Sequence, residues 1–133
     1  MQFSLPVYYT QTFKTKSDKT FLVSLNWYRN AHYFIQNDVK RFYHDTIENL
    51  VKDYPVLTGR YKVTYTYFFR NKTSDLPNVT PMTSKWVNDT LQSLKLVAND
   101  NVQYLVQEIH NVGEQDRDNP RVEVLIEPFD TNN

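Results

Sequence analysis

The sequence predicts an α+β fold, with one mixed, largely antiparallel sheet of about five strands and two helices packed on it. Two observations predict this class. The segment Gly59–Arg70 alternates between apolar and polar residues, as a half-buried strand does, and two other segments repeat apolar residues at helical spacing. The chain has 133 residues, which suits a single hydrophobic core. We therefore expect one domain over residues 1–133, with a frayed polar tail at residues 130–133.

Two strands and a helix are expected in the N-terminal half. The strands cover Gln2–Tyr9 and Thr20–Leu25, and a lysine-rich hairpin loop joins them. The helix covers Tyr33–Asp53, and Pro55 closes it. Its apolar residues recur largely at three- and four-residue spacing: Ile35, Val39, Phe42, Tyr43, Ile47, Leu50 and Val51.

The clearest strand is Gly59–Arg70, followed by one more helix and two more strands. The helix is expected over Thr80–Leu94, where Pro81 is tolerated in the first turn. The strands are expected over Val102–Val112 and Arg121–Pro128, which gives the order β-β-α-β-α-β-β. The expected apolar face of the clearest strand consists of Tyr61, Val63, Tyr65, Tyr67 and Phe69.

The composition excludes several classes of protein. The chain has no cysteine, so disulfides, thiolate zinc sites and cysteine nucleophiles are excluded. Its two glycines argue against glycine-rich phosphate loops, and hence against a nucleotide cofactor. No apolar run approaches the roughly 20 residues that a membrane span needs, and no secretion signal precedes the first strand. We therefore expect a cytoplasmic protein with no membrane partner.

Charge is divided unevenly along the chain, although the formal net charge is zero. Residues 1–72 carry 11 Lys/Arg and 5 Asp/Glu, and residues 73–133 carry 4 Lys/Arg and 10 Asp/Glu. The first part therefore has a formal charge of +6 and the second −6. This division suits a basic surface for nucleic acid beside an acidic one for metal, and it equally suits two solvated surfaces.

Three aspartates and a lysine lie where catalysis is expected. Asp75 follows the clearest strand, Lys85 and Asp89 lie four residues apart on the second expected helix, and Asp100 precedes the next strand. That helix would be about 22 Å long, and the six residues Lys95–Asp100, if extended, return roughly 20 Å. We therefore expect the carboxyl groups of Asp75 and Asp100 to meet at one edge of the sheet, with Lys85 facing them.

Carboxylates and an amide, without histidine or cysteine, are the ligands that a hard cation selects. The expected cation is Mg²⁺, with Mn²⁺ as the alternative. It would polarise a scissile phosphate and generate hydroxide, while Lys85 neutralises the developing charge. Aspartates are also common in loops and at helix caps for structural reasons, and Lys85–Asp89 alone is an ordinary surface pair. The expected metal ligands are Asp75, Asn78, Asp89 and Asp100.

Several short motifs occur in a fixed order between Leu22 and Tyr104. They are Asp75-Leu76-x-Asn78, then Lys85-x-x-x-Asp89-x-Leu91, then Asn99-Asp100-Asn101. Upstream stands Leu25-Asn26-Trp27-Tyr28-Arg29-Asn30-Ala31-His32-Tyr33. In residues and order, this region resembles the RusA family of phage and prophage Holliday-junction resolvases.

The resemblance implies a RusA-like fold and a Mg²⁺-dependent endonuclease that nicks four-way DNA junctions in pairs, as a homodimer. It implies a role in DNA recombination or repair in the cytoplasm of a bacterial host. It also implies an active site of three aspartates and a lysine. Two aspartates carry over onto Asp75 and Asp100, and the lysine onto Lys85. Asp89 matches another recurrent acid of the helix.

One position departs from the family pattern, because Pro77 stands where the family typically has a second acid. Asp89 or Asn78 would have to replace the missing ligand in an active enzyme. Two alternatives to the nuclease therefore remain. One is a protein of the same fold that binds branched DNA without cutting it, and the other is an unrelated phage accessory protein that binds another protein.

Basic and aromatic side chains are the expected contacts with DNA. Arg29 is the expected phosphate contact of the motif-rich segment, and the hairpin lysines suit a flexible basic finger. Trp27 and Tyr28 either stack on an exposed base or lie at the rim of the core. Structural roles are expected for His32, His44 and His110, which lack metal-ligand spacing. The predicted DNA-binding residues are Lys14, Lys16, Lys19, Tyr28, Arg29, Arg70 and Lys72.

Overall fold

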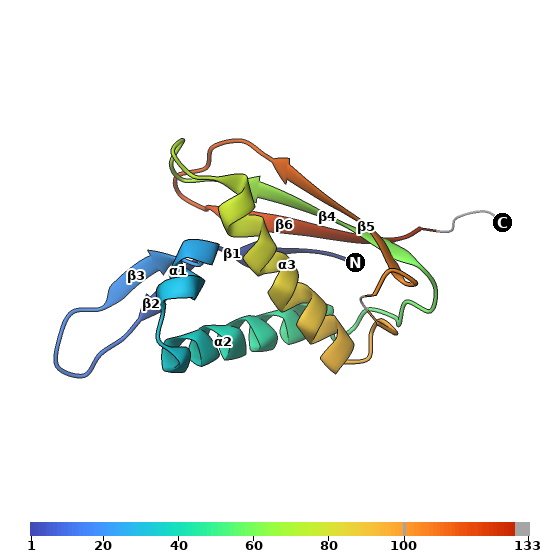
Figure 1. The fold of residues 1–133 in the computed structure, drawn as a ribbon, viewed down its shortest axis with the longest axis horizontal. Helices are drawn as coiled ribbons and strands as arrows, with labels where there is room; N and C mark the ends of the chain where they lie inside the picture. Colours follow the sequence, from blue (N-terminus) through green and yellow to red (C-terminus); the bar gives the residue numbers. More distant parts are fainter. Residues whose placement is uncertain (100, 130–133) are drawn as a thin grey trace.

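The computed structural model describes residues 1–99 and 101–129, and these form a mixed sheet with helices on one face (Figure 1). The α+β class predicted from the sequence is confirmed. Asp100 and the expected frayed tail, residues 130–133, lie outside the described residues. The elements in chain order are β1 (Gln2–Pro6), β2 (Tyr8–Gln11), β3 (Lys19–Leu22), α1 (Leu25–Asn30), α2 (Tyr33–Val51), β4 (Tyr61–Phe68), α3 (Leu76–Ser93), β5 (Leu105–Val112) and β6 (Arg121–Pro128).

The main sheet has four strands in the order β1-β6-β4-β5. Strand β6 runs antiparallel to both of its neighbours, β1 and β4, whereas β5 runs parallel to β4. Two parallel neighbours need a crossover connection, and here α3 provides it. The chain therefore leaves the carboxyl end of β4, runs along α3, and re-enters the sheet at the amino end of β5. This path fixes where the residues on either side of α3 lie.

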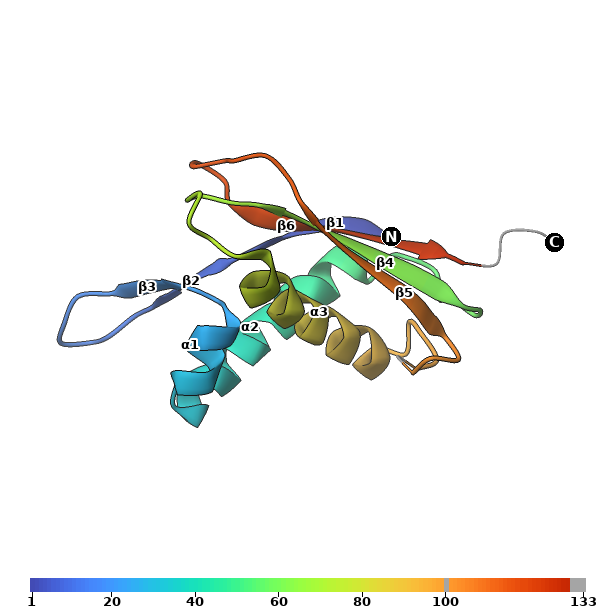
Figure 2. The same cartoon turned by 45° about the horizontal axis from the view of Figure 1, so that its top comes forward.

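The expected first strand, Gln2–Tyr9, is interrupted at Val7 and serves two sheets. Its first part, β1, pairs with β6 until Pro6 faces Arg121, the first residue of β6. Beyond that point the chain has no residue of β6 left to pair with. Its second part, β2, pairs instead with β3 in a hairpin that projects from the body (Figures 1 and 2). The single sheet of about five strands is thus replaced by a four-stranded sheet and a two-stranded one.

The two helix starts nearest the expected site differ from prediction. A strand was expected over Thr20–Leu25, but Ser24 caps a short helix, α1, by accepting a hydrogen bond from the Trp27 amide at 3.1 Å. Helix α3 was expected from Thr80, but it begins at Leu76. The first turn of a helix has amides without intrahelical partners, so Pro77 fits there without loss of a hydrogen bond.

The core lies between the sheet and the two long helices, which cover the same face of the sheet (Figure 2). The predicted apolar face of β4 is confirmed from Tyr61 to Tyr67, whose alternate residues are buried, whereas Phe69 follows the end of the strand and is half-buried. Helix α2 crosses under α3, where the ring of Tyr43 stacks on Trp86 with centroids 6.1 Å apart. Buried aromatic rings of this size contribute much of the apolar area that holds the layers together. The buried residues of α2 are Val39, Tyr43, Ile47 and Val51.

Candidate functional site

Asp75 stands at the N-terminus of α3, directly after the loop that follows β4. Its side chain is exposed and makes no capping hydrogen bond with the helix. The positive end of the helix dipole favours a carboxylate at this position. Three residues on, Asn78 Oδ1 accepts a hydrogen bond from the Asn26 amide at 3.1 Å and so ties α3 to α1. Of these two expected metal ligands, Asn78 therefore has a structural partner already.

Lys85 and Asp89 lie together on the middle of α3. The Lys85 Nζ is 3.5 Å from Asp89 Oδ2, and both side chains are nearly half exposed. Ten residues separate Asp75 from Lys85 along one continuous helix, a rise of about 15 Å. The structure therefore brings Lys85 and Asp89 together but does not bring Lys85 to Asp75. An exposed pair of this kind contributes only about 0.5 kcal/mol to helix stability.

The neighbours of Asp100 mark the opposite end of α3. Asn99 Oδ1 accepts a hydrogen bond from Gln92 Nε2 at 3.2 Å, one turn or less from the end of the helix. The Asn99 carbonyl also accepts from the hydroxyl of Tyr61, the first residue of β4. Helix α3 has 18 residues and is about 27 Å long, so Asn99 lies far from Asp75 within one chain. Parallel pairing of β4 and β5 imposes this separation, because α3 must span the sheet between them.

The predicted basic residues gather at the end of the molecule where α3 begins. We call this surface the basic end: Lys14, Lys16, Lys19, Arg29, Arg70 and Lys72. The three lysines lie on the projecting hairpin between β2 and β3 and on β3 itself, Arg29 lies on α1, and the last two lie between β4 and α3 (Figures 1 and 2). Aromatic rings support two of these cations. The Arg70 guanidinium lies 4.3 Å from the centre of the Tyr8 ring, and Lys16 Nζ lies 4.4 Å from the Phe13 ring.

The two aromatic residues of α1 have different surroundings. Tyr28 is half-buried, and its ring packs edge-on against the buried Trp86 with centroids 6.2 Å apart. This contact favours a place at the rim of the core for Tyr28. Trp27 instead stacks on Phe21 of the hairpin and lines a pocket that opens to solvent.

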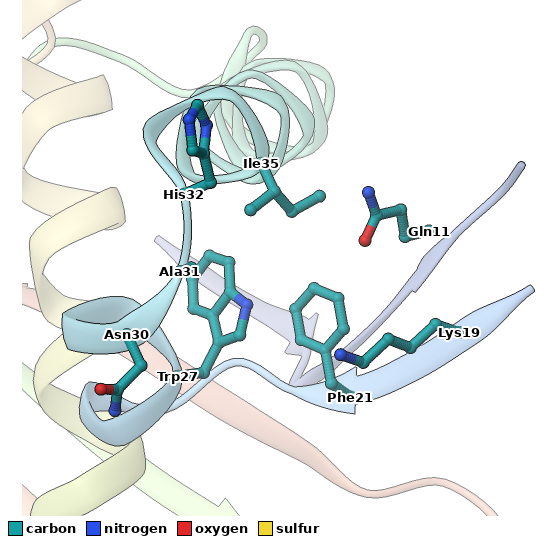
Figure 3. A pocket seen from close by; sticks show the side chains of 8 residues that line it. All are labelled: Gln11, Lys19, Phe21, Trp27, Asn30, Ala31, His32 and Ile35. Atoms are coloured by element: carbon teal, nitrogen blue, oxygen red, sulfur yellow. The ribbon is translucent and has the colours of Figure 1, made fainter.

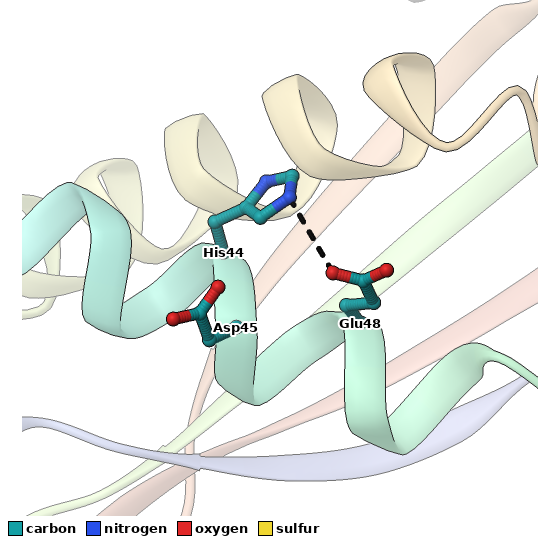
Figure 4. A group of neighbouring side chains, drawn as sticks. All are labelled: His44, Asp45 and Glu48. Atoms are coloured by element: carbon teal, nitrogen blue, oxygen red, sulfur yellow. Dashed lines mark ion pairs between the residues drawn. The ribbon is translucent and has the colours of Figure 1, made fainter.

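Helix α2 carries a group of side chains with metal-ligating atoms that the sequence did not single out (Figure 4). His44, Asp45 and Glu48 place one ligand atom each within 4.8 Å of one another, and His44 Nε2 lies 3.7 Å from Glu48 Oε1. Two of the three residues are exposed, and none is an expected Mg²⁺ ligand. A histidine and a glutamate one turn apart on a helix surface commonly pair without metal.

A second polar cluster, also missed, lies between α3 and the edge strand β5. The Ser84 hydroxyl donates to both carboxylate oxygens of Glu108, at 3.0 and 2.9 Å, and Asn88 Nδ2 donates to Oε2 at 3.1 Å. On the other side, His110 Nε2 lies 2.9 Å from Glu108 Oε1. We call these residues, with Thr80, the Glu108 network. Parallel register with β4 sets Glu108 beside Val63 and His110 beside Tyr65, so both face the helix layer.

His110 lies between Glu108 and Thr80. Its Nδ1 lies 2.8 Å from the Thr80 hydroxyl, which also donates to the Leu76 carbonyl, and its Nε2 lies within hydrogen-bond distance of Glu108. Burial disfavours the charged form of Glu108, but hydrogen bonds from His110, Asn88 and Ser84 outweigh burial and hold its pKa below the ordinary value.

The Glu108 network had a weak signal in the sequence. Thr80, Ser84 and Asn88 recur every four residues on α3, and Glu108 and His110 alternate on one face of β5. Each set taken alone reads as an ordinary polar face. Only the parallel register brings the two sets into contact, and pairing direction is absent from a local pattern.

Replacing Glu108 by alanine is expected to lower the free energy of unfolding by about 2 kcal/mol, because three donors lose a charged acceptor. Since the pKa of Glu108 is lowered in the folded state, its contribution is present above the ordinary glutamate value of 4.5 and disappears as the pH falls below it. Urea unfolding of wild type and variant from pH 7 to 3 measures both effects. The matched control is Glu127→Ala, whose carboxylate meets Lys62 only at 3.9 Å near solvent. An equal loss in both variants, or a difference that does not shrink with acid, would contradict the network's role.

No helix of residues 1–99 and 101–129 is long and apolar enough to cross a membrane. Comparison with protein-family models finds no match to the chain, and comparison with curated proteins finds none either.

Proposed function

We propose that this protein binds branched DNA, such as a four-way junction, at the basic end and cleaves it as a Mg²⁺-dependent homodimeric endonuclease. The observation that carries the proposal is the convergence of the predicted DNA contacts. Basic residues from three separate segments of the chain lie on the projecting hairpin, on α1 and in the loop that leads to the exposed Asp75. Cations on a projecting hairpin and on the neighbouring surface suit the two differently directed backbones that meet at a branch.

Charge at this end also supports a phosphate ligand. Residues 8–37, which form the hairpin, α1 and the first turn of α2, contain four Lys/Arg and one acid, Asp18. A surface with this balance attracts a polyanion and binds it in a salt-dependent way. The acids of the second half include Glu114 and Asp116 in the loop before β6, which is hydrogen-bonded to Phe69 and Arg70. The positive surface is therefore that of the hairpin and α1.

Within one chain, residues 1–99 and 101–129 do not supply a complete Mg²⁺ site. Asp75 is available, but Asn78 is engaged with α1, and Asp89 is paired with Lys85 about 21 Å along the helix from Asp75. In a dimer whose two α3 helices run antiparallel across a two-fold axis, the start of each helix lies beside the end of the other. We propose that Asp75 of one subunit and Asp100 of the partner subunit then share a site. Such a dimer has two equivalent sites, as paired cutting of two strands requires.

The second candidate function is binding of branched DNA without cleavage. Pro77 supports it, because this residue follows Asp75 by two positions and offers no ligand atom where the family has an acid. A site with one carboxylate fewer holds a hard cation more weakly.

The two candidates are separated by measuring binding and cleavage of the same DNA. A labelled four-way junction and a linear duplex of the same sequence are titrated in EDTA, and cleavage is then followed with Mg²⁺ or Mn²⁺. Preferential binding of the junction with paired nicks supports the nuclease, and binding without nicks supports the second candidate. Equal or no binding of the two DNAs at low salt contradicts both and favours an accessory protein that binds another protein.

The change Pro77→Asp is expected to raise Mg²⁺-dependent cleavage by at least about tenfold, because it adds a metal ligand beside Asp75. An acid in the first turn of α3 is also favourable for the helix, so the fold should be retained. The rate of junction cleavage measures the effect. The control is Thr73→Asp, which adds the same charge to the exposed loop just before α3. A similar increase in cleavage rate in both variants would mean that added negative charge, and not an added metal ligand, causes the increase.

A further inference from the structure

A pocket of about 320 Å³ lies between the projecting hairpin and the first turns of α1 and α2 (Figure 3). This volume is within the range of pockets that hold small ligands. Three chain segments contribute to it: the β2–β3 hairpin, α1 and the start of α2. Neither the proposed metal site nor the phosphate contacts of the basic end account for it, because its wall is aromatic.

The aromatic wall consists of Phe21 from β3 and Trp27 from α1. Their ring centroids are 5.1 Å apart and their planes differ by 18°, so the rings are stacked. Both residues are only half-buried, and Figure 3 shows the two rings side by side at the pocket, with Ile35 above them. Each ring covers part of one face of the other, and the parts of the two rings that stay open at the pocket are available to stack on a planar ligand.

The rim of the pocket is polar and carries no acid. Gln11 and Asn30 bring amide groups, which both donate and accept hydrogen bonds, and Lys19 brings a positive charge. Because no carboxylate lines the pocket, the pocket does not suit a cationic ligand. A planar, neutral ligand with donors and acceptors on its edge and an anion attached fits this set of groups. A nucleobase on its sugar-phosphate chain has all of these properties.

Exposed rings continue the aromatic surface next to the pocket. Tyr33 and Phe34 are 58% and 64% exposed, and the rings of these two residues and of His32 lie with centroids 4.3–5.0 Å apart. Large aromatic side chains seldom stay this exposed unless a partner covers them. Lys19 of the hairpin lines the same pocket, so a positive charge lies beside the aromatic wall, as in single-strand binding sites.

We infer that this pocket receives an unpaired base from the branch point of DNA. The inference rests on the proposed function and identifies how that surface distinguishes its substrate. Taking a base out of a continuous duplex costs a few kcal/mol, whereas a base at a branch is already partly unstacked. The pocket therefore adds a preference for branched over linear DNA to the one that the phosphate contacts provide.

The fluorescence of Trp27 can report whether a base binds in the pocket. The chain has two tryptophans, and the other, Trp86, is buried in the core. In the variant Trp86→Phe, fluorescence comes from Trp27 alone. Saturation with a four-way junction, or with short single-stranded oligothymidylate, is expected to quench this emission by about half, because a base stacks on the indole. A linear duplex at saturation is expected to leave the emission unchanged.

A second measurement uses the change Trp27→Leu in the otherwise native chain. Loss of one stacked base is expected to weaken junction binding about tenfold while affinity for linear duplex stays the same. Unchanged duplex affinity also shows that the variant is folded. The fluorescence experiment leaves Phe21 and Trp27 in place, so its result does not depend on the Trp27→Leu substitution.

The outcomes separate the inference from the proposed function. Two results would overturn the role of the pocket and leave the DNA-binding function in place. One is tight junction binding without quenching of Trp27. The other is equal weakening of junction and duplex binding by Trp27→Leu in a protein of native thermal stability. Failure to bind any branched or single-stranded DNA at low salt overturns both.

Discussion

A protein in which Lys14, Lys16 and Lys19 are replaced by alanine is expected to bind a four-way junction about 100-fold more weakly than the wild type, because three phosphate contacts are lost. Each contact releases a counterion from the DNA. The slope of log affinity against log salt should therefore become shallower by roughly three. The three residues are exposed, and the substitutions remove no core contact, so stability should change little. Titrations of labelled junction at several salt concentrations measure both quantities.

The matched control replaces three lysines elsewhere, and it changes the net charge by the same amount. Lys52 caps the far end of α2, Lys95 follows α3, and Lys62 meets Glu127 on the outer face of the sheet. The control should keep most of its affinity, because these residues lie away from the basic end. A loss equal to that of the hairpin variant would mean that binding follows overall charge, and the basic end would then have no special role.

The fold could be predicted where a local pattern determines it. Alternation from Tyr61 to Tyr67 has a period of two, so it fixes both the strand and the face that is buried. Helix α2 could be predicted for the same reason at a period near 3.6. Its buried residues all belong to the predicted face, whereas Leu50, at the edge of that face, is 41% exposed.

What depends on distant partners could not be predicted. The strand expected over Gln2–Tyr9 divides because β6 begins opposite Pro6, a fact about a segment more than 100 residues away. The parallel pairing of β4 with β5 likewise leaves no signal in either segment alone. We expected a largely antiparallel sheet, so the effect of this pairing on the candidate site was not anticipated. That effect is the separation of Asp75 from Asn99 by the length of α3. The expectation that both ends of α3 contribute to one site within a chain depended on this unseen pairing.

Candidate residues could be predicted by type more reliably than by neighbourhood. The basic residues of the hairpin, α1 and the loop after β4 were singled out for their charge, and the structure gathers them at one end. The Glu108 network was missed because serine, asparagine and threonine are ordinary on a helix face. Its significance comes from the carboxylate that α3 and β5 enclose together.

Replacing Asp75 by asparagine is expected to lower cleavage of a four-way junction at least about 100-fold and to leave binding nearly unchanged, since one metal ligand is lost and no phosphate contact is. Asp100→Asn should have the same effect if both acids serve the site. Single-turnover cleavage with Mg²⁺, beside a binding titration in EDTA, measures the two steps separately. Asp118→Asn is the control, because this exposed acid lies in the loop before β6. Equal cleavage by wild type and Asp75→Asn would remove Asp75 from the site.

A mixture of the two inactive variants tests whether the site is shared between subunits. In a mixed dimer, Asp75 of the Asp100→Asn chain meets Asp100 of the Asp75→Asn partner, so one of the two sites is intact. Random exchange makes about half of the dimers mixed, so about a quarter of the wild-type sites return, and each mixed dimer nicks only one strand. If each chain held its own complete site, mixing would restore nothing, because every chain carries a defect. Recovered single nicks would thus show that Asp75 and Asp100 of different subunits serve one reaction. Continued inactivity of dimers that are shown to exchange subunits would exclude the shared site.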